Sequence, residues 1–449
     1  MQMAQQTLTK TGYKILGKNP LKGTIETLGA KNSVTKCLVA SLLTDEICVL
    51  TNVPNIQEVE VTVEMLESIG SKIHWDRKAH SISIHTPQIT STTVANRFSG
   101  ANRIPILLLG ALIGRTNQPI KIPSVGGCQI GARPVNFHFD ALKTLGVELS
   151  VQKEEQTDLY IAQAVKGLQG GVIRLDYPSL GASENALLAA SWAQGTTYIH
   201  NISLEPEFLD LIHFVQKIGV IVSFVDDRTL KVQKGVHRGV EHKLVSDRAY
   251  AASFAMLAYA TEGEIFVKGA RQEHLGNFLS ILQQIKAPFW VENDGILFRY
   301  TRPLEGSVSV ETGPYPNFLT DMQQPLVTLL TQTKGCHQVH ETVYEQRFGY
   351  TKTLIEMGGH ISLSQNCCGE LTCRFKNQDY MHSAFISGPT PLSGKDIFIP
   401  DLRAGFAYVI AALTAEGTST LQNIHYLQRG YGDLLKPLQS LGADISYLD

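Results

Sequence analysis

Apolar and polar residues follow one pattern six times along the 449-residue chain. In each copy, small and apolar residues recur at helical spacing, a short run rich in β-branched residues follows, and a second, amphipathic helix closes the unit. We expect the six first helices within residues 29–43, 101–114, 181–195, 246–263, 320–335 and 399–417. Self-similarity with a period of roughly 65–85 residues predicts an architecture of repeated units.

The second helix of each copy is expected to end at a residue that turns the chain back. Glycine is typical of this position, because it adopts a positive φ without steric cost. Lys286 replaces glycine in the fourth copy, and the other five copies end at Gly70, Gly146, Gly219, Gly358 and Gly442.

A single unit cannot bury a helix face and a sheet face by itself, so several units must share a core. Six units divide most simply into two domains of three pseudo-symmetric β/α units each, which makes the fold class α/β. We expect the first domain at residues 21–245 and the second at residues 1–20 and 246–449. A strand over residues 8–16 would complete the second domain.

Composition narrows the function classes. The chain is 43% hydrophobic and 18% charged with a net charge of −2. It therefore lacks the excess of positive charge that is typical of proteins that bind nucleic acid or an anionic membrane. The apolar run at residues 104–114 is too short to span a bilayer, and the first residues do not resemble a signal peptide. Seven cysteines, an odd number, favour a reducing compartment. These features predict a soluble, cytoplasmic protein.

The second copy is longer than its siblings, and its extra residues form a glycine-rich stretch around Cys128. Such a stretch is typical of a loop that closes over a site. Gly126, Gly127 and Gly131 flank the thiol and Arg133 follows it, which indicates an exposed, electropositive setting for proton transfer or nucleophilic attack. The alternative is a buried, inert thiol, which is common for free cysteine.

Charged residues recur where the first helices begin. A lysine or arginine in a first helical turn opposes the helix dipole, at a cost of about 0.3–1 kcal/mol, unless an anion compensates. Such residues are Lys31, Arg103, Arg248 and Arg403, and Arg133, Arg347 and Arg429 precede three of the second helices. Helix N-termini and guanidinium groups bind phosphate and carboxylate, so we expect a substrate with several negative charges. For Asp321 and Asp401, a plain N-cap is the alternative to a functional role.

Sequence motifs for nucleotide phosphates and metals are missing. The chain has no Walker A sequence, no GxGxxG after an opening strand, no HExxH and no paired CxxC. Cys367, Cys368 and Cys373, with His360 nearby, are the one conceivable metal constellation. Their spacing fits no standard zinc pattern, and cysteines packed on strands are the favoured interpretation. We therefore expect neither a metal nor a cofactor.

Six motifs in order make the chain resemble the cell-wall enolpyruvyl transferases, the UDP-N-acetylglucosamine 1-carboxyvinyltransferase family, from about residue 14 to 447. The motifs are GAKN (29–32), GGCxIGARPV (126–135), TDMQ (320–323), ETVYEQRF (341–348), DLRAG (401–405) and QRGY (428–431). The resemblance implies two domains of three units in an inside-out α/β barrel arrangement, with the active site in the cleft between the domains.

The same resemblance implies roles for individual residues. Cys128 would protonate the methylene carbon of phosphoenolpyruvate, and Asp321 would take the proton of the sugar 3-hydroxyl. The phosphate would be held by Lys31, Arg133 and Arg429, and the carboxylate and developing charge would be neutralised by Arg347 and Arg403. The nucleotide-sugar site would be lined by Asn32, Arg103, Arg133, Pro134, Val135, Asn136, Phe137, Tyr177, Ser179, Leu180, Gly181 and Val343. The implied substrates are phosphoenolpyruvate and UDP-N-acetylglucosamine.

Three positions depart from the family pattern. Asn136 stands where the family often has aspartate, Tyr177 where it often has lysine, and Gly349-Tyr350 where Met-His is usual. Asn136 and Tyr177 leave a different nucleotide acceptor open. The shikimate-phosphate relatives, an RNA-end-processing enzyme with a related repeat and an inactive paralogue are further alternatives. The motif GAKN argues against the shikimate-phosphate relatives, and the near-neutral charge argues against RNA-end processing. The joint presence of Cys128 and the basic residues argues against an inactive paralogue.

Overall fold

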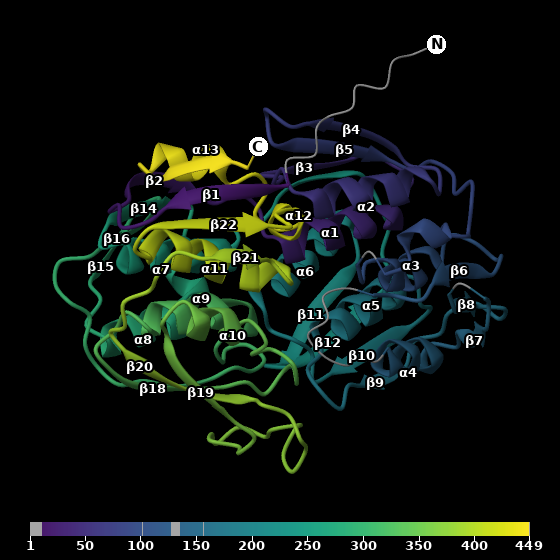
Figure 1. Cartoon of the computed structure of the whole chain (residues 1–449). Helices are drawn as coiled ribbons and strands as arrows, with labels where there is room; N and C mark the ends of the chain where they lie inside the picture. The colour runs from purple at the N-terminus through teal and green to yellow at the C-terminus, as the bar shows by residue number, and fades with distance from the viewer. Residues whose placement is uncertain (1–10, 101, 127–134, 156, 449) are drawn as a thin grey trace. The chain divides into compact units, whose positions relative to one another are not determined.

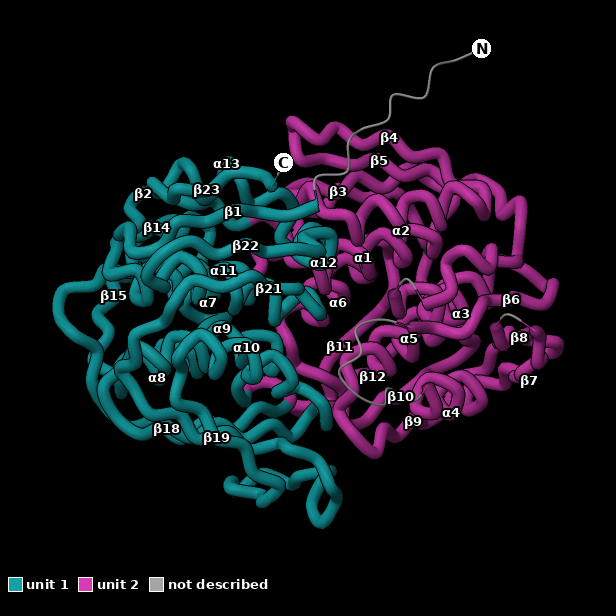
Figure 2. The backbone as a smooth tube through the Cα atoms, viewed as in Figure 1, with its two compact units in different colours: residues 1–27, 248–313, 317–449 teal, residues 28–247, 314–316 magenta. Residues whose placement is uncertain are grey.

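The computed structural model describes residues 11–100, 102–126, 135–155 and 157–448. The chain forms two compact units, coloured separately in Figure 2. Unit 1 comprises the residues up to Thr27, 248–313 and those from Asn317 onward, and unit 2 comprises residues 28–247 and 314–316. Each unit contains three of the six repeats and three separate β-sheets.

Unit 2 holds the first three repeats (Figure 1). Its first helices are α1 (Lys31–Ala40), α3 (Pro105–Leu112) and α5 (Leu180–Ala190), and its second helices are α2 (Gln57–Glu67), α4 (Asn136–Thr144) and α6 (Pro206–Ile218). The short 3-10 helices are η1 (Ser41–Leu43) and η2 (Asn96–Phe98). The strands are β3 (Cys48–Thr51), β4 (Lys72–Asp76), β5 (Ser81–His85), β6 (Ile120–Pro123), β7 (Glu148–Gln152), β8 (Leu159–Gln163), β9 (Val172–Arg174), β10 (Thr196–His200), β11 (Ile221–Asp226), β12 (Thr229–Gln233) and β13 (Val240–Lys243).

Unit 1 holds the last three repeats and the N-terminal strands. Its helices are α7 (Arg248–Ala260), α8 (Gly276–Gln284), α9 (Gln323–Leu330), α10 (Thr351–Glu356), α11 (Leu402–Thr414), α12 (His425–Gln428) and α13 (Leu435–Ser440), with η3 (Gln272–His274) and η4 (Thr320–Met322). The strands are β1 (Gly12–Leu16), β2 (Lys22–Glu26), β14 (Glu264–Lys268), β15 (Phe289–Glu292), β16 (Gly295–Arg299), β17 (Ser309–Glu311), β18 (Gly335–His340), β19 (His360–Ser364), β20 (Ser383–Gly388), β21 (Asp396–Phe398), β22 (Thr418–Gln422) and β23 (Asp444–Tyr447).

All six sheets share one topology, which is the structural form of the sequence repeat. The strand after the first helix pairs in parallel with an edge strand and antiparallel with the last strand of the repeat, which in turn pairs with the strand after the second helix. The orders are β13-β3-β5-β4, β6-β8-β7 and β9-β10-β12-β11 in unit 2, and β2-β14-β16-β15, β17-β18-β20-β19 and β21-β22-β1-β23 in unit 1. In the second repeat, a single parallel bridge from Thr93 to Lys121 takes the place of the edge strand.

Two strands explain where the units divide. The N-terminal strand β1 occupies the last-strand position of the sixth repeat, since it pairs antiparallel with both β22 and β23. Strand β2 pairs in parallel with β14 and therefore lies in unit 1, although the sequence boundary at residue 21 groups it with the first three repeats.

The first helices form the core of each unit, and the sheets lie outside them. In α11 every residue is buried, and in α5 every residue from Ala182 onward is buried. A helix that is apolar on all sides is typical of such a central position. The approach of α3 to α5 requires glycine at position 110, because a Cβ there would lie 2.3 Å from Oδ1 of Asn185 and 2.6 Å from its carbonyl oxygen.

The predicted chain reversals after the second helices are present in all six repeats. Gly219, for example, has a φ of 118° and accepts no Cβ without strain, and the other four glycines also have positive φ. Lys286 takes the same conformation, with a φ of 55°. The backbone of the fourth repeat therefore keeps the geometry of its siblings although its residue is not glycine.

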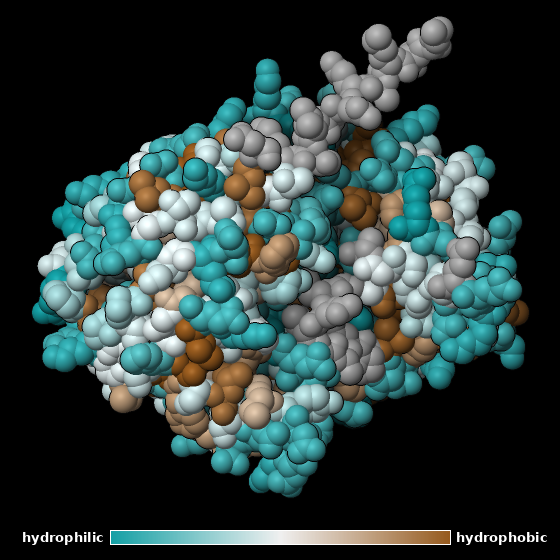
Figure 3. All heavy atoms as spheres, in the orientation of Figure 1, coloured by the Kyte–Doolittle hydropathy of each residue, from teal (hydrophilic) through white to brown (hydrophobic). Residues whose placement is uncertain are grey.

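Hydrophilic side chains cover most of the face drawn in Figure 3, and hydrophobic ones appear as small separate patches. Among the described residues, no helix has the length and apolar character needed to cross a membrane.

Candidate active site

Asp321 lies at the centre of the candidate site in unit 1. It is the middle residue of η4, directly before α9. Its carboxylate accepts hydrogen bonds from Nη2 of Arg347 at 2.8 Å and from Nη2 of Arg403 at 3.0 Å. The N-cap positions of η4 and α9 belong to Leu319 and Met322, not to Asp321. Asp321 is thus an ion-paired carboxylate, and the alternative of a plain helix cap does not apply to it.

Asp401 does act as a cap. It is the N-cap of α11, and its side chain accepts from the backbone N–H groups of Arg403 and Ala404 at 2.9 and 3.1 Å. The carboxylates of Asp401 and Asp321 are the negative charges that compensate Arg403 in the first turn of α11, as the sequence predicted. The two aspartates that looked alike in sequence therefore have different roles.

Both arginines are buried. The side chains of Arg347 and Arg403 are only 2% and 5% exposed, whereas that of Asp321 is 20% exposed, so the carboxylate is the open side of the cluster. Burial alone would lower the pKa of Arg347, but the carboxylates of Asp321, Asp401 and Glu341 together raise that pKa above its usual value. Arg347 therefore stays charged.

Tyr431, from the QRGY motif, fixes the orientation of Arg403. Its hydroxyl accepts a hydrogen bond from Nη1 of Arg403 at 3.0 Å. Ser253 donates to the carbonyl of Ala249 at 2.7 Å, so the Tyr431 hydroxyl donates to Ser253 Oγ, 3.0 Å away. The Tyr431 ring stacks on Phe406 at 4.5 Å. A guanidinium held on two sides keeps a fixed plane for a carboxylate or phosphate.

Glu341 connects the segments that carry Asp321 and Arg347. Its Oε2 accepts from the Thr320 hydroxyl at 2.9 Å, and its Oε1 accepts from the backbone N–H groups of Val343 and Tyr344 at 2.9 and 3.1 Å. Burial raises the pKa of this carboxyl, although Arg347 and the hydrogen bonds oppose the shift. Glu341 thus holds the turn before α9 and the loop after β18 in one arrangement.

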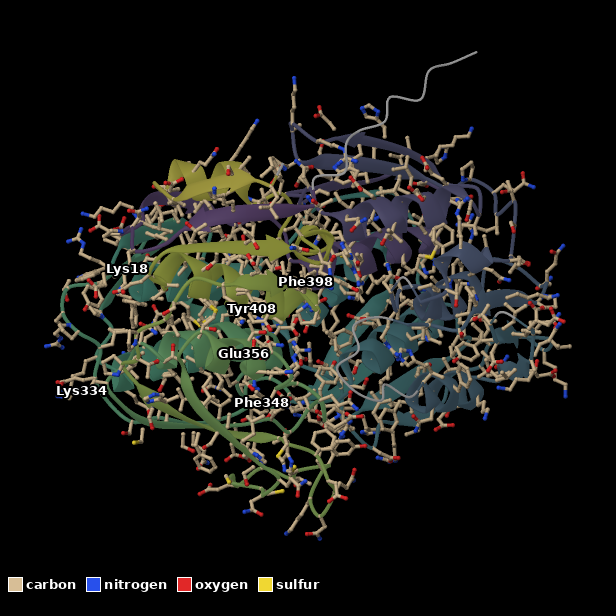
Figure 4. All side chains as sticks on the ribbon, in the orientation of Figure 1. Lys18, Lys334, Phe348, Glu356, Phe398 and Tyr408 are labelled. Carbon is tan, nitrogen blue, oxygen red and sulfur yellow. The ribbon has the colours of Figure 1, made fainter. Side chains whose placement is uncertain are left out.

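A second connection joins the two arginine-bearing elements. Tyr408 of α11 and Phe348, which follows Arg347, are labelled in Figure 4. The Tyr408 hydroxyl contacts the carbonyl of Tyr350 and Oγ1 of Thr353, both at 3.1 Å. The remaining predicted residues of unit 1 are half-buried: Val343 lies in the loop after β18, and Arg429 is the C-cap of α12.

In unit 2, Lys31 and Asn32 are the first two residues of α1 and are half-buried. No acidic residue stands in the first turn of this helix, but the backbone N–H of Lys31 donates to Oδ2 of Asp247 at 3.1 Å. A carboxylate from a distant part of the sequence thus compensates the helix dipole.

Arg103 was expected inside the first turn of a helix, and the structure corrects this. Helix α3 begins at Pro105, because proline suits the first helical position, and Arg103 lies two residues ahead of it. Its charge acts on His138 of α4 instead. Burial and the nearby Arg103 lower the pKa of His138 to about 3, so the ring is neutral at physiological pH.

His138 links the starts of α4 and α5. Its Nδ1 accepts a hydrogen bond from the Asn185 side chain at 3.3 Å, and a Cβ on Gly181 would lie 3.2 Å from its ring. Ser179 caps α5 by accepting from the N–H of Ala182 at 3.4 Å. The contact brings together the predicted nucleotide-sugar residues Val135, Asn136 and Phe137 with Tyr177, Ser179, Leu180 and Gly181. Asn136 is exposed at the first position of α4, and Tyr177 is half-buried.

Three predicted site residues, Cys128, Arg133 and Pro134, lie outside the described residues, and their roles stay predictions. Glu341, Ser253, Tyr431 and His138 were not singled out from the sequence, whereas Asn185 was noted only as one of the polar residues at the start of a first helix. Glu341 and Tyr431 stand inside quoted motifs, so a signal existed for these two. The positions of Ser253 and His138 offered none.

Comparisons with known proteins identify the family of the chain. The family model of EPSP synthase (3-phosphoshikimate 1-carboxyvinyltransferase) matches residues 15–447. A UDP-N-acetylglucosamine 1-carboxyvinyltransferase from Protochlamydia amoebophila is 48% identical over 97% of this chain and 94% of that relative. A protein of the same name from Chlamydia trachomatis serovar D is 47% identical over 97% of both chains. The chain belongs to the UDP-N-acetylglucosamine 1-carboxyvinyltransferase family.

Solved structures support the fold of this transferase. The enolpyruvyl transferase NikO from Streptomyces tendae matches with a TM-score of 0.85 at 23% identity, over 97% of this chain and 98% of that one. An EPSP synthase from Acinetobacter baumannii matches with a TM-score of 0.73 at 16% identity, over 97% and 100% of the two chains. The family and the α/β fold class predicted from the sequence are confirmed.

Proposed function

We propose that the chain transfers the enolpyruvyl group of phosphoenolpyruvate to the 3-hydroxyl of UDP-N-acetylglucosamine and releases phosphate. This reaction is the first committed step of peptidoglycan precursor synthesis. The names of relatives 46–48% identical over nearly the whole chain support it. The observation that carries the proposal is the pairing of the partly exposed Asp321 carboxylate with the buried Arg347 and Arg403.

Asp321 suits the role of general base. Two neighbouring guanidinium groups favour its ionised form, which is the form that accepts a proton. In the addition step, the sugar oxygen bonds to C2 of phosphoenolpyruvate, its proton passes to Asp321, and Cys128 delivers a proton to C3. In the elimination step, C3 returns a proton to the Cys128 thiolate, the C2–C3 double bond forms again as the bond from C2 to the phosphate oxygen breaks, and phosphate leaves with the proton that Asp321 had taken.

The basic residues stabilise the negative charges of both substrates. Arg347 and Arg403 neutralise the carboxylate of phosphoenolpyruvate and the charge that develops next to it, because fixed positive charge lowers the energy of such transition states. Lys31, Arg133 and Arg429 hold the phosphate. The starts of α4 and α5 in unit 2, with Asn32 and Arg103, bind the nucleotide sugar. The reaction takes place in the cytoplasm, in keeping with the sequence prediction.

Phosphate release tests the reaction. The intact protein is incubated with phosphoenolpyruvate, with and without UDP-N-acetylglucosamine, and with an epoxide phosphonate such as fosfomycin as a thiol reagent. We expect acceptor-dependent release that the epoxide blocks and that Cys128→Ala abolishes, whereas Cys336→Ala, which removes an exposed cysteine, keeps it. If Cys128 is labelled but no phosphate is released with UDP-N-acetylglucosamine, the enzyme uses a different acceptor. Absence of both would refute enolpyruvyl transfer.

Asp321→Asn separates the base from the binding site. The amide keeps the shape of the side chain but cannot accept the proton, so the rate should fall by roughly 10²–10⁴-fold. Binding of UDP-N-acetylglucosamine, measured by calorimetry, should stay close to that of the unchanged protein. An unchanged rate would exclude Asp321 as the base.

A further inference from the structure

Four potential metal ligands converge in unit 1, beside the long connection between β19 and β20. They are His340 at the end of β18, Cys367 and Cys373 within the connection, and His382 directly before β20. One ligand atom from each lies within 4.8 Å of all the others. In Figure 1 this connection is the yellow-green excursion at the bottom of the picture. His360, which the sequence placed with the cysteines, is exposed at the start of β19 and is not a member of the group.

His382 is held in the tautomer that a metal requires. Its Nδ1 lies 2.7 Å from the carbonyl oxygen of Tyr380, and a carbonyl can only accept, so Nδ1 carries the proton. The lone pair of the neutral ring is therefore on Nε2. That nitrogen lies 3.4 Å from Sγ of Cys367.

His340 has the same arrangement. Its Nδ1 lies 2.8 Å from Oγ of Ser383, whose single hydroxyl proton is donated to the carbonyl of Asn366 at 2.6 Å. Ser383 must therefore accept from Nδ1, and Nε2 again carries the lone pair. His340 is fully buried, and no described group makes a hydrogen bond to its Nε2. A buried polar atom without a partner calls for an explanation, and a bound ion supplies one.

The surroundings of the two sulfur atoms also match a metal site. Sγ of Cys373 accepts from the backbone N–H of Phe375 at 3.4 Å, a contact that stabilises a thiolate. The ring of Phe375 is buried and packs edge-on against His382 with centroids 6.0 Å apart, which limits access of water. Cys368 differs from its neighbour, because its thiol donates to the carbonyl of Asn366.

We propose that His340, Cys367, Cys373 and His382 bind a divalent ion of the zinc class in a closed, tetrahedral Cys2His2 site. Zinc lies about 2.3 Å from thiolate sulfur and about 2.0 Å from imidazole nitrogen, so tetrahedral ligand atoms are about 3.3–3.8 Å apart. The pair of Cys367 and His382 already has this separation, and the others need to close by about 1.5 Å at most. With all four positions taken by protein, the ion is structural.

The site would staple a long connection that has little regular structure of its own. Residues 365–382 contain neither helix nor strand, and segments of this length need added constraints to stay ordered. The ion would fix the connection to the end of β18. Glu341 directly follows the ligand His340, and its backbone N–H donates to the carbonyl of His382 at 2.8 Å. The metal site therefore adjoins the residue that holds the Asp321 and Arg347 segments.

Metal content tests the proposal. The full chain, expressed with added zinc and purified under reducing conditions, should contain about one zinc ion per molecule by mass spectrometry. Cobalt(II) exchanged into the site should show the visible absorption of tetrahedral thiolate coordination. Cys373→Ser should lower metal content and affinity by roughly tenfold or more, whereas the neighbouring Cys368→Ser should leave both unchanged. Circular dichroism verifies that both variants are folded.

A second measurement follows how far the bound ion protects the connection from proteolysis. Arg374 and Lys376 are exposed trypsin sites inside the connection. Removal of the ion by a chelator should accelerate cleavage after these residues, and added zinc should restore resistance. The proposal is overturned if the reduced, folded chain binds neither zinc nor cobalt. It is also overturned if metal loss is equal in Cys368→Ser and Cys373→Ser, or if the thiols of Cys367 and Cys373 are found joined as a disulfide in the native protein.

Discussion

Replacing Glu341 tests how the candidate active site is held in place. This buried carboxylate accepts hydrogen bonds from Thr320, next to Asp321, and from Val343 and Tyr344 in the loop that leads to Arg347. Glu341→Ala removes the acceptor of all three hydrogen bonds. Glu341→Gln keeps one oxygen as acceptor for the two backbone N–H groups. The other oxygen becomes an NH2 group, from which the Thr320 hydroxyl can accept a hydrogen bond after it rotates.

The magnitude follows from these contacts. A buried group that loses its partner costs about 1–3 kcal/mol. Glu341→Ala leaves two backbone N–H groups without an acceptor, and the hydroxyl can reorient, so the free energy of unfolding should fall by about 3 kcal/mol. Glu341→Gln loses the charge but few contacts and should cost about 1 kcal/mol. Since a displacement of about 1 Å at reacting groups can lower a rate 10²-fold, we expect kcat to fall by roughly that factor in Glu341→Ala.

Urea unfolding and steady-state phosphate release measure the two effects on the same preparations. Gln346→Ala is the matched control, because Gln346 is exposed in the same loop. A structural role of Glu341 is refuted if Glu341→Ala changes neither the unfolding free energy nor kcat by more than this control does. A loss of stability with an unchanged kcat would show that Glu341 supports the fold of unit 1 but does not position Asp321 and Arg347.

Three further predictions concern stability. Burial, with the nearby Glu205 and Glu207, raises the pKa of Glu184 from 4.5 to about 7, so the folded state holds this proton longer than the unfolded state. The free energy of unfolding should then decrease by up to about 3 kcal/mol as pH rises from 4.5 to 7. Urea unfolding at several pH values should show that Glu184→Gln lacks this decrease. If the variant and the unchanged protein have the same pH dependence, Glu184 is not its source. Gly110→Ala should cost about 3 kcal/mol in thermal unfolding, because the added Cβ overlaps Asn185. Gly276→Ala, with nothing within 4 Å, should instead stabilise the chain by about 0.5–1 kcal/mol, and equal effects would contradict the packing argument. Lys286→Gly should raise the unfolding free energy by about 0.5–1 kcal/mol, because it relieves a positive φ at the loss of one exposed ion pair to Glu305. The reverse change, Gly442→Lys, should lower it by about 1–2 kcal/mol, and a gain there would refute the assignment.

The sequence by itself determined the features that depend on near neighbours in the chain. The helical spacing of small apolar residues marked the six first helices, terminal glycines marked five reversals, and the repeat period placed the sixth at Lys286. Both signals are local, because helix period and backbone φ are set by a residue and its closest neighbours. The motifs around Asp321, Arg347 and Arg403 likewise identified the centre of the candidate site before any contact between them was visible.

The tertiary structure alone decided which partners distant residues have. Asp321 and Asp401 both precede a buried helix in sequence, yet one pairs with two arginines and the other caps α11. Arg103 acts on His138, 35 positions further on, and His340 joins cysteines that follow it only after β19. Such pairings depend on how strands and helices pack, and sequence spacing carries no information about that packing. For this reason the spacing of Cys367 and Cys373 matched no zinc pattern, whereas the fold supplies the two missing histidines.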